Sequence, residues 1–401
     1  MELLATILIL CLVSCGTATS ATRYSLSNDI VDVTKFGAIG DGKTDNSQAF
    51  IKAWKAVCLA TTNPTLTIPK GKNFQLKPVE FNGPCKSSTI TIQVDGNIVG
   101  PSSLREWGSR QLDTWLKLSH VNGLVIKGSG QIDGRGEFWW RAANKLPRRP
   151  VALTFVDCKN LRLSGLTHIN SPGAHISVVG GDGSVLSNLN ITAPGSSPNT
   201  DGIDLSHSTN VQILGSNIAT GDDCICISTN SSFINITNVA CGPGHGISIG
   251  SLGKDGSTDI VEEVHVKDVS FKPGATSGLR IKTWQGGHGY ARKISYDGVT
   301  LEGASNPIII DQFYCDRHPP VCKNETSAVQ ISDITYTNVH GTSISDDSIS
   351  LKCSQSIGCT NLVLNDINIT SASRGIVTKS TCFNAHGKHG PTIPSVDCLL
   401  P

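Results

Sequence analysis

The chain has 401 residues, of which 38% are hydrophobic and only 5% aromatic, and its formal net charge is +1. A protein without a basic excess is a poor candidate for binding nucleic acid or an anionic membrane surface, so we expect neither as a partner. With 41 Gly and 18 Pro, the composition favours many short strands and turns over long helices.

The first segment of the chain is apolar over residues 3–13, a length too short to span a bilayer. Small residues follow, with Ala18 and Ser20 at the two positions that a signal peptidase reads, although the first residues lack the usual positive charge. We therefore expect residues 1–20 to be a cleaved signal peptide and residues 21–401 to be a single secreted domain. No later segment is apolar enough to predict a membrane span.

The next elements are a strand, a turn and one short helix. Residues 30–33 alternate as a strand does, and a turn-rich segment follows at residues 36–42. Asp45 is placed to cap a helix over residues 46–58, whose apolar residues are spaced to face a core. Further short strands, separated by Gly, Pro and Asn turns, are expected over residues 64–100.

From Asn160 onward one pattern recurs, in which apolar and polar residues alternate, then Asn, Asp or Gly interrupts them, and then the alternation resumes. Its copies start 22 to 37 residues apart, and the longer gaps hold Gly- or Cys-bearing insertions. The copies lie at residues 161–166, 185–189, 211–216, 233–239, 264–269, 294–299, 331–334 and 362–367.

Alternation with a period of two marks half-buried strands, and Asn or Gly supplies the backbone conformation of a tight bend. A right-handed parallel β-helix explains the pattern, because its short strands stack coil on coil with their apolar sides inward. A β-sandwich has a similar strand spacing, but it does not explain why the bend residue recurs at one place in each repeat. We therefore expect a single-domain, all-β solenoid, with the helix at residues 46–58 covering its open first coil.

Cysteine usage agrees with export. Two of the 14 Cys, Cys11 and Cys15, lie in the expected signal peptide, and an even number remains, which suggests disulfides. Zinc is the rival explanation, but the chain contains no Cys-x-x-Cys motif. Short spacings favour three disulfides that each close a small loop, Cys353–Cys359, Cys315–Cys322 and Cys382–Cys398. A fourth, Cys224–Cys241, would link two neighbouring coils. Asn-x-Ser/Thr sequons, which fit a glycosylated surface, lie at Asn190, Asn230, Asn235, Asn324 and Asn368.

Four polar motifs fall within this repeat region. Between them, Asp201, Asp222, His245 and Arg280 are 21, 23 and 35 residues apart, close to one coil each. Equivalent positions on adjacent coils lie roughly 4.8 Å apart, so the motifs are expected to share one outward groove. They are Asn199–Asp201, Gly221–Cys224, Cys241–Gly246 and Arg280–Lys282.

Clustered carboxylates suit glycosidic hydrolysis, in which one carboxyl protonates the leaving oxygen while another, ionised, activates water or attacks carbon. Taken singly, Asp222-Asp223 is as easily a turn and Gly244-His245-Gly246 a loop. A calcium site is the more serious alternative for the three Asp residues. His245, Arg280 and Lys282 are unsuitable neighbours for a hard dication, and the two cations suit a polymer of uronic acids.

These motifs closely resemble the four signature motifs of the polygalacturonases, glycoside hydrolase family 28, and the resemblance extends from about Val31 to the C-terminus. Residues 41–45 and Ser171-Pro172 with His175 resemble the same family. The chain is most similar to plant members, and among them to the pollen-type group often called exopolygalacturonases. The resemblance implies a right-handed parallel β-helix that hydrolyses α-1,4-linked galacturonan with inversion, in the cell wall, as a monomer and without a cofactor or metal.

The resemblance also implies residue roles. Asp222 is expected to be the general acid, Asp201 and Asp223 to position and deprotonate the water, and His245 to hold the acid in its working protonation state. Arg280 and Lys282 are expected to bind a galacturonate carboxylate. Tyr314 resembles the family's substrate-contacting tyrosine. His175 is a candidate groove residue, with a packed core histidine as the alternative, and Asn199 either contacts sugar or fixes the coil bend.

One residue departs from the pattern, because many members carry a histidine where this chain has Asp204. Counting alternation from Asp201 places Asp204 on the other side of the strand, away from the groove, with catalysis intact. The resemblance to exopolygalacturonases favours exo over endo attack. An exo enzyme needs loops that close one end of the groove, and the insertions at residues 101–115, 140–150 or 300–325 are candidates for them. A calcium-dependent lyase and an inactive pectin-binding relative are the remaining alternatives.

Overall fold

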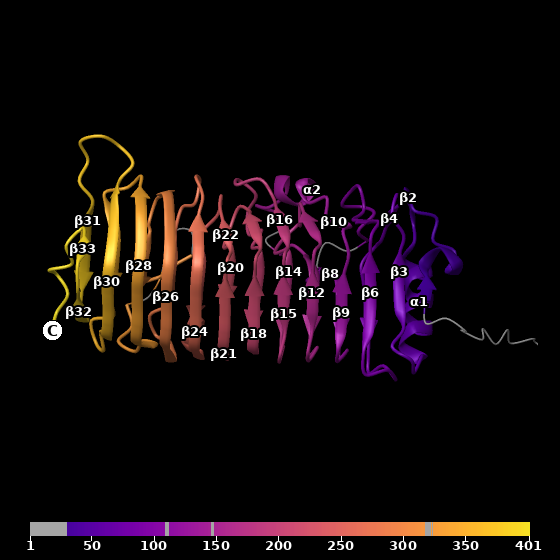
Figure 1. Ribbon diagram of the computed structural model, residues 1–401, viewed down its shortest axis with the longest axis horizontal. Coiled ribbons are helices and arrows are strands. Elements are labelled where there is room, and N and C mark those ends of the chain that lie inside the picture. Colours follow the sequence, from indigo (N-terminus) through magenta and orange to yellow (C-terminus); the bar gives the residue numbers. More distant parts are fainter. Residues whose placement is uncertain (1–29, 109–111, 146–147, 317–321, 323) are drawn as a thin grey trace, which may run out of the picture.

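The computed structural model describes residues 30–108, 112–145, 148–316, 322 and 324–401, and these are wound into one elongated right-handed parallel β-helix (Figure 1). The predicted fold class is thereby confirmed. The expected signal peptide lies outside the described residues. In the described part of the chain, no helix is both long and apolar enough to cross a membrane.

The wall that carries the motifs is a parallel sheet of 11 described strands, which receives one strand from each coil. Its strands are β5 (Val79–Asn82), β8 (Thr114–Ser119), β11 (Val151–Val156), β14 (Ile176–Val179), β17 (Ile203–Ser206), β20 (Ile225–Ile227), β23 (Ile247–Leu252), β25 (Leu279–Thr283), β27 (Ile308–Asp311), β29 (Asp347–Lys352) and β31 (Lys379–Phe383).

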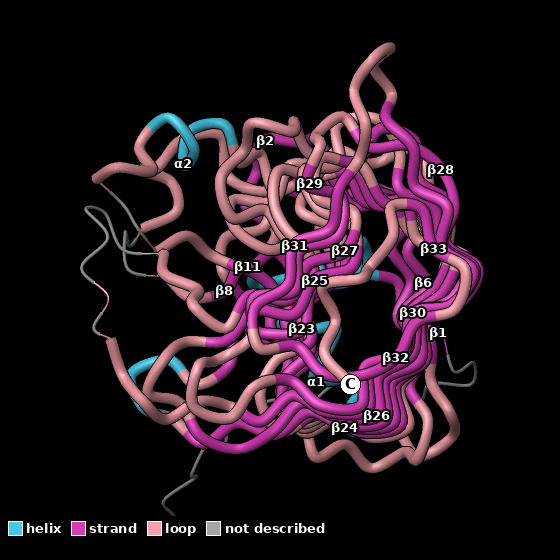
Figure 2. Tube along the Cα trace, turned by 90° about the vertical axis from the view of Figure 1, so that its left-hand side faces the viewer, coloured by secondary structure: helices cyan, strands magenta, loops and turns pink. Residues whose placement is uncertain are grey.

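The facing wall is a sheet of 22 described strands, and Figure 2 shows the two walls end-on around a common interior. In most coils of this sheet two short strands meet at a bend, whereas in β24, β26, β28 and β30 they merge into one long strand. The strands are β1 (Ile30–Asp32), β2 (Asp41–Asp45), β3 (Thr65–Ile68), β4 (Asn73–Gln75), β6 (Ile90–Val94), β7 (Asn97–Val99), β9 (Leu124–Lys127), β10 (Gln131–Asp133), β12 (Arg162–Ser164), β13 (Thr167–Ile169), β15 (Val185–Ser187), β16 (Asn190–Thr192), β18 (Thr209–Leu214), β19 (Asn217–Ala219), β21 (Ser231–Thr237), β22 (Ala240–Cys241), β24 (Thr258–Phe271), β26 (His288–Ala304), β28 (Gln330–Ser343), β30 (Cys359–Ser371), β32 (Ala385–His389) and β33 (Thr392–Ile393).

The predicted repeats fall on this second wall, and their apolar residues stack inward in strict register. One such ladder is fully buried and consists of Leu163, Leu186, Ile213, Ile236, Val266, Tyr296, Tyr336 and Leu364. The bend residue of each repeat has a positive φ, as a tight bend requires. These bend residues are Gly165, Asn188, Gly215, Asn238, Asp268, Gly298, Asn338 and Asp366.

The first coil is covered by the predicted helix, α1 (Ser47–Leu59), which lies at the N-terminal end of the stack (Figure 1). Its buried face includes Ala53 and Trp54, and the Asp45 carboxylate accepts a hydrogen bond from the backbone N–H of Ser47. The other helical segments of the described residues are α2 (Glu137–Arg141) and two 3-10 turns, η1 (Val33–Phe36) and η2 (Lys254–Gly256).

Five disulfides link the described residues, and they include all four predicted pairs. The fifth, Cys58–Cys85, fastens the end of α1 to the coil beneath it. Cys158 and Cys226 are free thiols. All five sequon asparagines are exposed.

Candidate active site

The motif residues come together because β17, β20, β23 and β25 stack in register. The residues aligned across these strands at the buried positions are Ile203, Ile225, Ile247 and Leu279. Asp201, Asp223 and His245 each stand two residues before the aligned position, so they occupy equivalent places on three successive coils. The fourth coil supplies Arg280 and Lys282, which flank the buried Ile281 and therefore both point outward from β25.

Asp222 is held by three neighbours. The Nδ1 of His245 lies 2.8 Å from Asp222 Oδ1, and the backbone N–H of Asp223 donates to the same oxygen at 2.8 Å. Asn199 Nδ2 lies 3.4 Å from the other oxygen, Oδ2. The Asp222 side chain remains 18% exposed and that of His245 37% exposed. This carboxyl is therefore fixed in place and still open to the groove.

Asp223 is buried beside the cations of the next coils. Its side chain is only 1% exposed, and its Oδ2 accepts a hydrogen bond from Lys282 Nζ at 2.7 Å. Ser248 Oγ donates to Oδ1 at 2.7 Å, and Arg280 Nη1 lies 3.7 Å from the same oxygen. These contacts give the buried carboxylate the cation and the hydrogen-bond donor that burial requires.

Asp201 and Asp204 lie on the same side of β17, which makes the sequence-based placement of Asp204 wrong. The nearest side-chain oxygens of these two residues and the Cys226 sulfur all lie within 4.8 Å of one another. The alternation does not run back to Asp201, because β17 begins only at Ile203 and Asp201 belongs to the preceding bend. Asp204 points outward between the buried Ile203 and Leu205, in line with Cys226, Ser248 and Arg280.

These neighbours shift the carboxyl pKa values in opposite directions. For Asp222, burial disfavours the charged form, but the hydrogen bond and charge of His245 outweigh it and the pKa is lowered. Burial, together with the charges of Asp204, Asp222 and Asp223, raises the pKa of Asp201 well above its ordinary value. Burial opposes charge on Lys282 as well, yet Asp223 prevails and the pKa of Lys282 is raised.

Asn199 is exposed and has a positive φ, which agrees with the alternative that it fixes the coil bend. Its side chain connects Asp222 to a residue that the sequence reasoning missed. Arg149 Nη2 donates to Asn199 Oδ1 and, at 3.1 Å, to the Pro198 carbonyl. Arg149 carries no motif, and only its place in the insertion at residues 140–150 pointed toward the groove.

His175 lies elsewhere, and the structure supports the core alternative. The residue is fully buried, and its ring nitrogens lie 3.0 Å from the Asp201 carbonyl and 3.3 Å from the Thr192 carbonyl. Burial lowers the pKa of His175 to about 4, so the ring is neutral. Of the two alternatives that the sequence left open, the burial of the ring favours the packed core histidine. It supports the backbone of Asp201.

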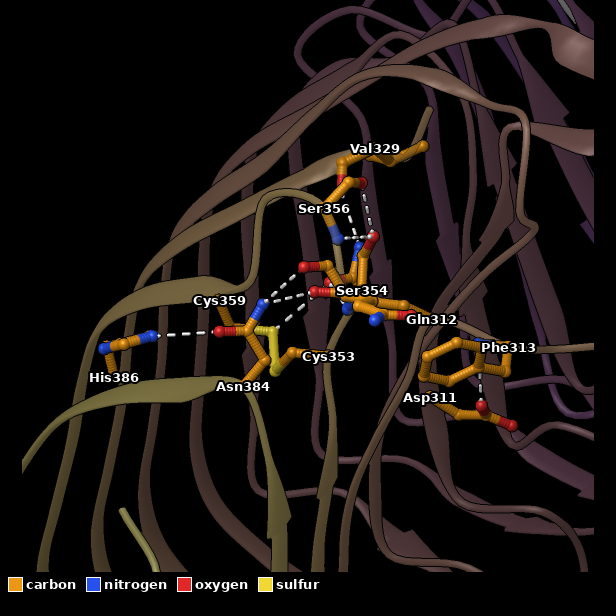
Figure 3. Close-up of a disulfide and its surroundings, with 11 residues drawn as sticks. Asp311, Gln312, Phe313, Val329, Cys353, Ser354, Ser356, Cys359, Asn384 and His386 are labelled. Atoms are coloured by element: carbon orange, nitrogen blue, oxygen red, sulfur yellow. Dashed lines mark hydrogen bonds between the residues drawn. A yellow bond between two sulfur atoms is a disulfide. The ribbon is translucent and has the colours of Figure 1, made fainter. Parts of the chain in front are cut away.

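Tyr314 lies over the two cations, with its ring centre 5.5 Å from both the Arg280 guanidinium and Lys282 Nζ. The ring of Trp284 packs edge-on against it at 5.6 Å. The segment that carries Tyr314 is anchored by Gln312, whose amide donates to the Val329 carbonyl at 2.7 Å and accepts from the Ser354 N–H at 2.9 Å (Figure 3).

Within the described part of the chain, two groups of side chains lie close enough together to hold a metal ion. They are Asp222, Asp223 and His245, and Asp201, Asp204 and Cys226. Calcium prefers six to eight oxygen ligands. Each group instead combines two carboxyls with a nitrogen or a sulfur, and Lys282 Nζ already occupies one oxygen of Asp223. The donor set does not fit a hard dication.

Comparison with known proteins agrees with this arrangement. The model of glycosyl hydrolases family 28 matches residues 58–391. The chain belongs to glycosyl hydrolases family 28. This family member is 47% identical to a probable polygalacturonase of Arabidopsis thaliana, over 93% of the chain and 81% of that protein. It is 42% identical to polygalacturonase-2 of Solanum lycopersicum, over 89% of the chain and 78% of that protein.

Solved structures support the fold of this family 28 protein. An exopolygalacturonase from Thermotoga maritima superposes with a TM-score of 0.74, at 19% identity over 91% of both chains. An endo-xylogalacturonan hydrolase from Aspergillus tubingensis gives a TM-score of 0.75, at 24% identity over 88% of this chain and 99% of the other.

Proposed function

We propose that this family 28 protein is a polygalacturonase, which hydrolyses the α-1,4 bonds between galacturonate units of pectate in the cell wall after secretion. The observation that carries the proposal is the single groove in which Asp201, Asp222 and Asp223 meet Arg280 and Lys282 on adjacent coils. Carboxyls supply the acid and base that the reaction needs, and cations suit a substrate with a carboxylate on every unit.

Asp222 is the proposed general acid, because it is the carboxyl that is both held in place and open to the groove. Without substrate, its contact with His245 favours the ionised form. A galacturonate carboxylate bound nearby adds negative charge, which raises the pKa of Asp222 toward that of a working acid. Reaction at mildly acidic pH follows, since the acid has to be protonated while the base is not.

Asp201 and Asp223 are proposed to position the attacking water from the opposite side of the bond. Inversion requires the acid and base carboxyls to be about 6.5–9.5 Å apart, so that a water fits between them. Asp222 and Asp223 have side-chain oxygens within 4.8 Å of each other. The separation that inversion needs is therefore expected between Asp222 and Asp201.

Exo attack is the proposed mode, and contacts from two insertions support it. Arg149, in the insertion at residues 140–150, holds Asn199, while Tyr314, in the insertion at residues 300–325, covers Arg280 and Lys282. Both segments reach the motif residues, so either is a candidate for closing one end of the groove, as exo attack requires. The alternative is endo attack along an open groove.

The test is product analysis on polygalacturonate with the wild type, Asp222→Asn and the surface control Asp397→Asn. Galacturonate monomer released from the start, with a slow fall in viscosity, is the expected result for an exo enzyme. Mixed oligomers with a rapid fall in viscosity would make it endo-acting. Asp222→Asn is expected to lose activity and Asp397→Asn to keep it, and a fully active Asp222→Asn would remove the assigned acid.

Two rival functions have distinct signatures in the same assay. A lyase would be inhibited by EDTA and would leave an unsaturated product end, whereas the hydrolase is expected to be unaffected by EDTA. An inactive pectin-holding relative would bind pectate and release no reducing ends.

A further inference from the structure

Asp204 is a carboxyl in the groove to which the proposed mechanism gives no role. It lies on β17 in register with Ser177 of the preceding coil and Cys226 of the next. Its Oδ1 is buried and has no hydrogen-bond partner. A nearby oxygen of Asp201 and the Cys226 sulfur lie within 4.8 Å of it and of each other. A half-buried carboxyl with one buried oxygen that lacks a hydrogen-bond partner, beside a candidate base, calls for a chemical explanation.

The charges that face Asp204 are mostly of its own sign. Asp201 approaches from the same coil, and Asp222 and Asp223 from the bend before β20. Cys226 on β20 is a thiol, whose pKa burial and these carboxyls raise well above its ordinary value, so it stays neutral. The one nearby cation is Lys282 on β25, and its Nζ is committed to Asp223 at 2.7 Å.

A buried charge without a partner is costly, and a carboxyl in that position avoids the cost by keeping its proton. A protonated carboxyl becomes a hydrogen-bond donor. Within the cluster the acceptors that face Asp204 are carboxylate oxygens, and the one on its own coil belongs to Asp201. A hydrogen bond to an ionised carboxylate stabilises the charged form.

We propose that Asp204 is a positioning residue that carries a proton at mildly acidic pH and donates it in a hydrogen bond to Asp201, so that this pair holds one negative charge. The proposal rests on the proposed function only for its kinetic consequence. The hydrogen bond keeps Asp201 ionised as a base and orients it toward the water. It also spares the groove a fourth negative charge, which would repel the galacturonate carboxylates.

The proton is expected to leave at neutral pH. Burial, with the charges of Asp223 and Asp222, raises the pKa of Asp204 to about 7. Burial and the neighbouring carboxyls raise the pKa of Asp201 as well, and in the proposed pair the hydrogen bond from Asp204 opposes that shift and leaves the shared negative charge on Asp201. Below about pH 7 the pair then carries a single charge, and above it a second charge appears beside Asp201. Substrate binding and base orientation are then lost together, so kcat/KM is expected to fall as pH rises through this value.

The direct test needs no substrate. The infrared C=O band of protonated carboxyls is measured on the ligand-free protein between pH 5 and pH 8.5, for the wild type, Asp204→Asn, Asp201→Asn and the surface control Asp397→Asn. We expect the wild type and the control to lose one such band near pH 7, and Asp204→Asn to lack it at pH 5. The proposal is overturned if Asp204→Asn retains that band or if Asp201→Asn alone removes it.

The kinetic test compares kcat/KM on polygalacturonate for the wild type and Asp204→Asn. The amide can donate to Asp201 but cannot ionise, so the variant-to-wild-type ratio is expected to rise about tenfold between pH 6 and pH 8. A ratio that stays constant with pH would refute the role of Asp204. If the wild type shows no hydrolysis at all, the proposed function fails, while the infrared result still decides where the proton lies.

Discussion

The groove contains two pairs of carboxyls that differ in their partners. Asp222 and Asp223 are held by His245, Ser248 and Lys282, whereas Asp201 and Asp204 face each other and a neutral thiol. The pKa of Asp222 is lowered, while those of Asp201 and Asp204 are raised. The comparison teaches that the side chains one coil away, and not the residue type, decide which carboxyl carries charge.

Removing the cation from the first pair is expected to have the largest effect. Lys282→Met leaves the Asp223 carboxylate buried without its partner, which costs about 3–5 kcal/mol in unfolding free energy, and activity is expected to fall at least about a hundredfold. The control is Lys293→Met, which breaks an exposed pair with Glu263 of similar length, 2.8 Å. Thermal unfolding and kcat/KM measure both effects, and equal losses in the two variants would contradict this view of the site.

His245→Gln is the next test, since it removes the group that keeps Asp222 ionised. The pKa of Asp222 is expected to rise, which moves the alkaline limb of the pH–kcat/KM profile to higher pH and lowers the maximum by about a hundredfold. His265→Gln is the matched control, an exposed histidine 3.6 Å from the Glu263 carboxylate. An unchanged alkaline limb in His245→Gln would show that the contact does not control the acid.

His175, which supports the backbone of Asp201 in the second pair, has a second buried histidine, His168, near it, and His168 allows a test through stability. Its ring is fully buried, neither nitrogen has a hydrogen-bond partner, and burial lowers its pKa to about 3. Below pH 6.5 the His168 ring binds a proton in the unfolded chain, whereas in the folded chain it stays neutral until the pH falls to about 3. Stability is therefore complete above pH 6.5 and is lost as the pH falls toward 3.

His168→Leu fills the position between Ile132 and Ile191 with an apolar residue. Its unfolding free energy, relative to the wild type, is expected to be higher at pH 5 than at pH 7.5 by about 2 kcal/mol. Chemical denaturation at the two pH values measures it, with the exposed His120→Leu as control. The same difference at both pH values would mean that packing, not protonation, is responsible.

Tyr314→Leu is expected to have the smallest effect. The ring lies 5.5 Å from both cations of the groove, a contact worth about 1–2 kcal/mol. Its loss is expected to raise KM about 5- to 30-fold with little change in kcat. Tyr314→Phe keeps the ring and should stay close to the wild type, and a Phe variant as weak as Leu would assign the effect to the hydroxyl.

Much of the fold could be predicted because each coil of the solenoid repeats the same pattern of apolar residues and bend residues. Leu163, Leu186 and Ile213 stack in the structure as their shared repeat positions predicted. Spacing also placed Asp201, Asp222 and His245 on successive coils, since one coil is about the length that separates them. The same reasoning gave Arg280 and Lys282 a common side of one strand.

What the sequence did not reveal lies at the bends and in long-range contacts. Alternation failed for Asp204 because the strand starts after Asp201, and no residue marks that start. Arg149 reaches the groove from an insertion without a repeat, and Cys58 pairs with a cysteine 27 residues away across a coil. The burial of His175 depends on neighbours from other coils. Such features depend on contacts between residues that are far apart in the sequence, and these contacts do not repeat from coil to coil.

The registered stacking of β17, β20, β23 and β25 also determines what kinds of change the molecule can survive. A residue inserted directly before Ile225, with the rest of the coil held in register, would turn the buried Ile225 and Ile227 outward and bring Cys226 inside, because side chains alternate along a strand. A residue inserted in a bend or in a segment between coils leaves every strand in place. Evolution can therefore lengthen the segments around the groove, and so alter which substrates fit, while the spacing of the reacting groups is inherited unchanged.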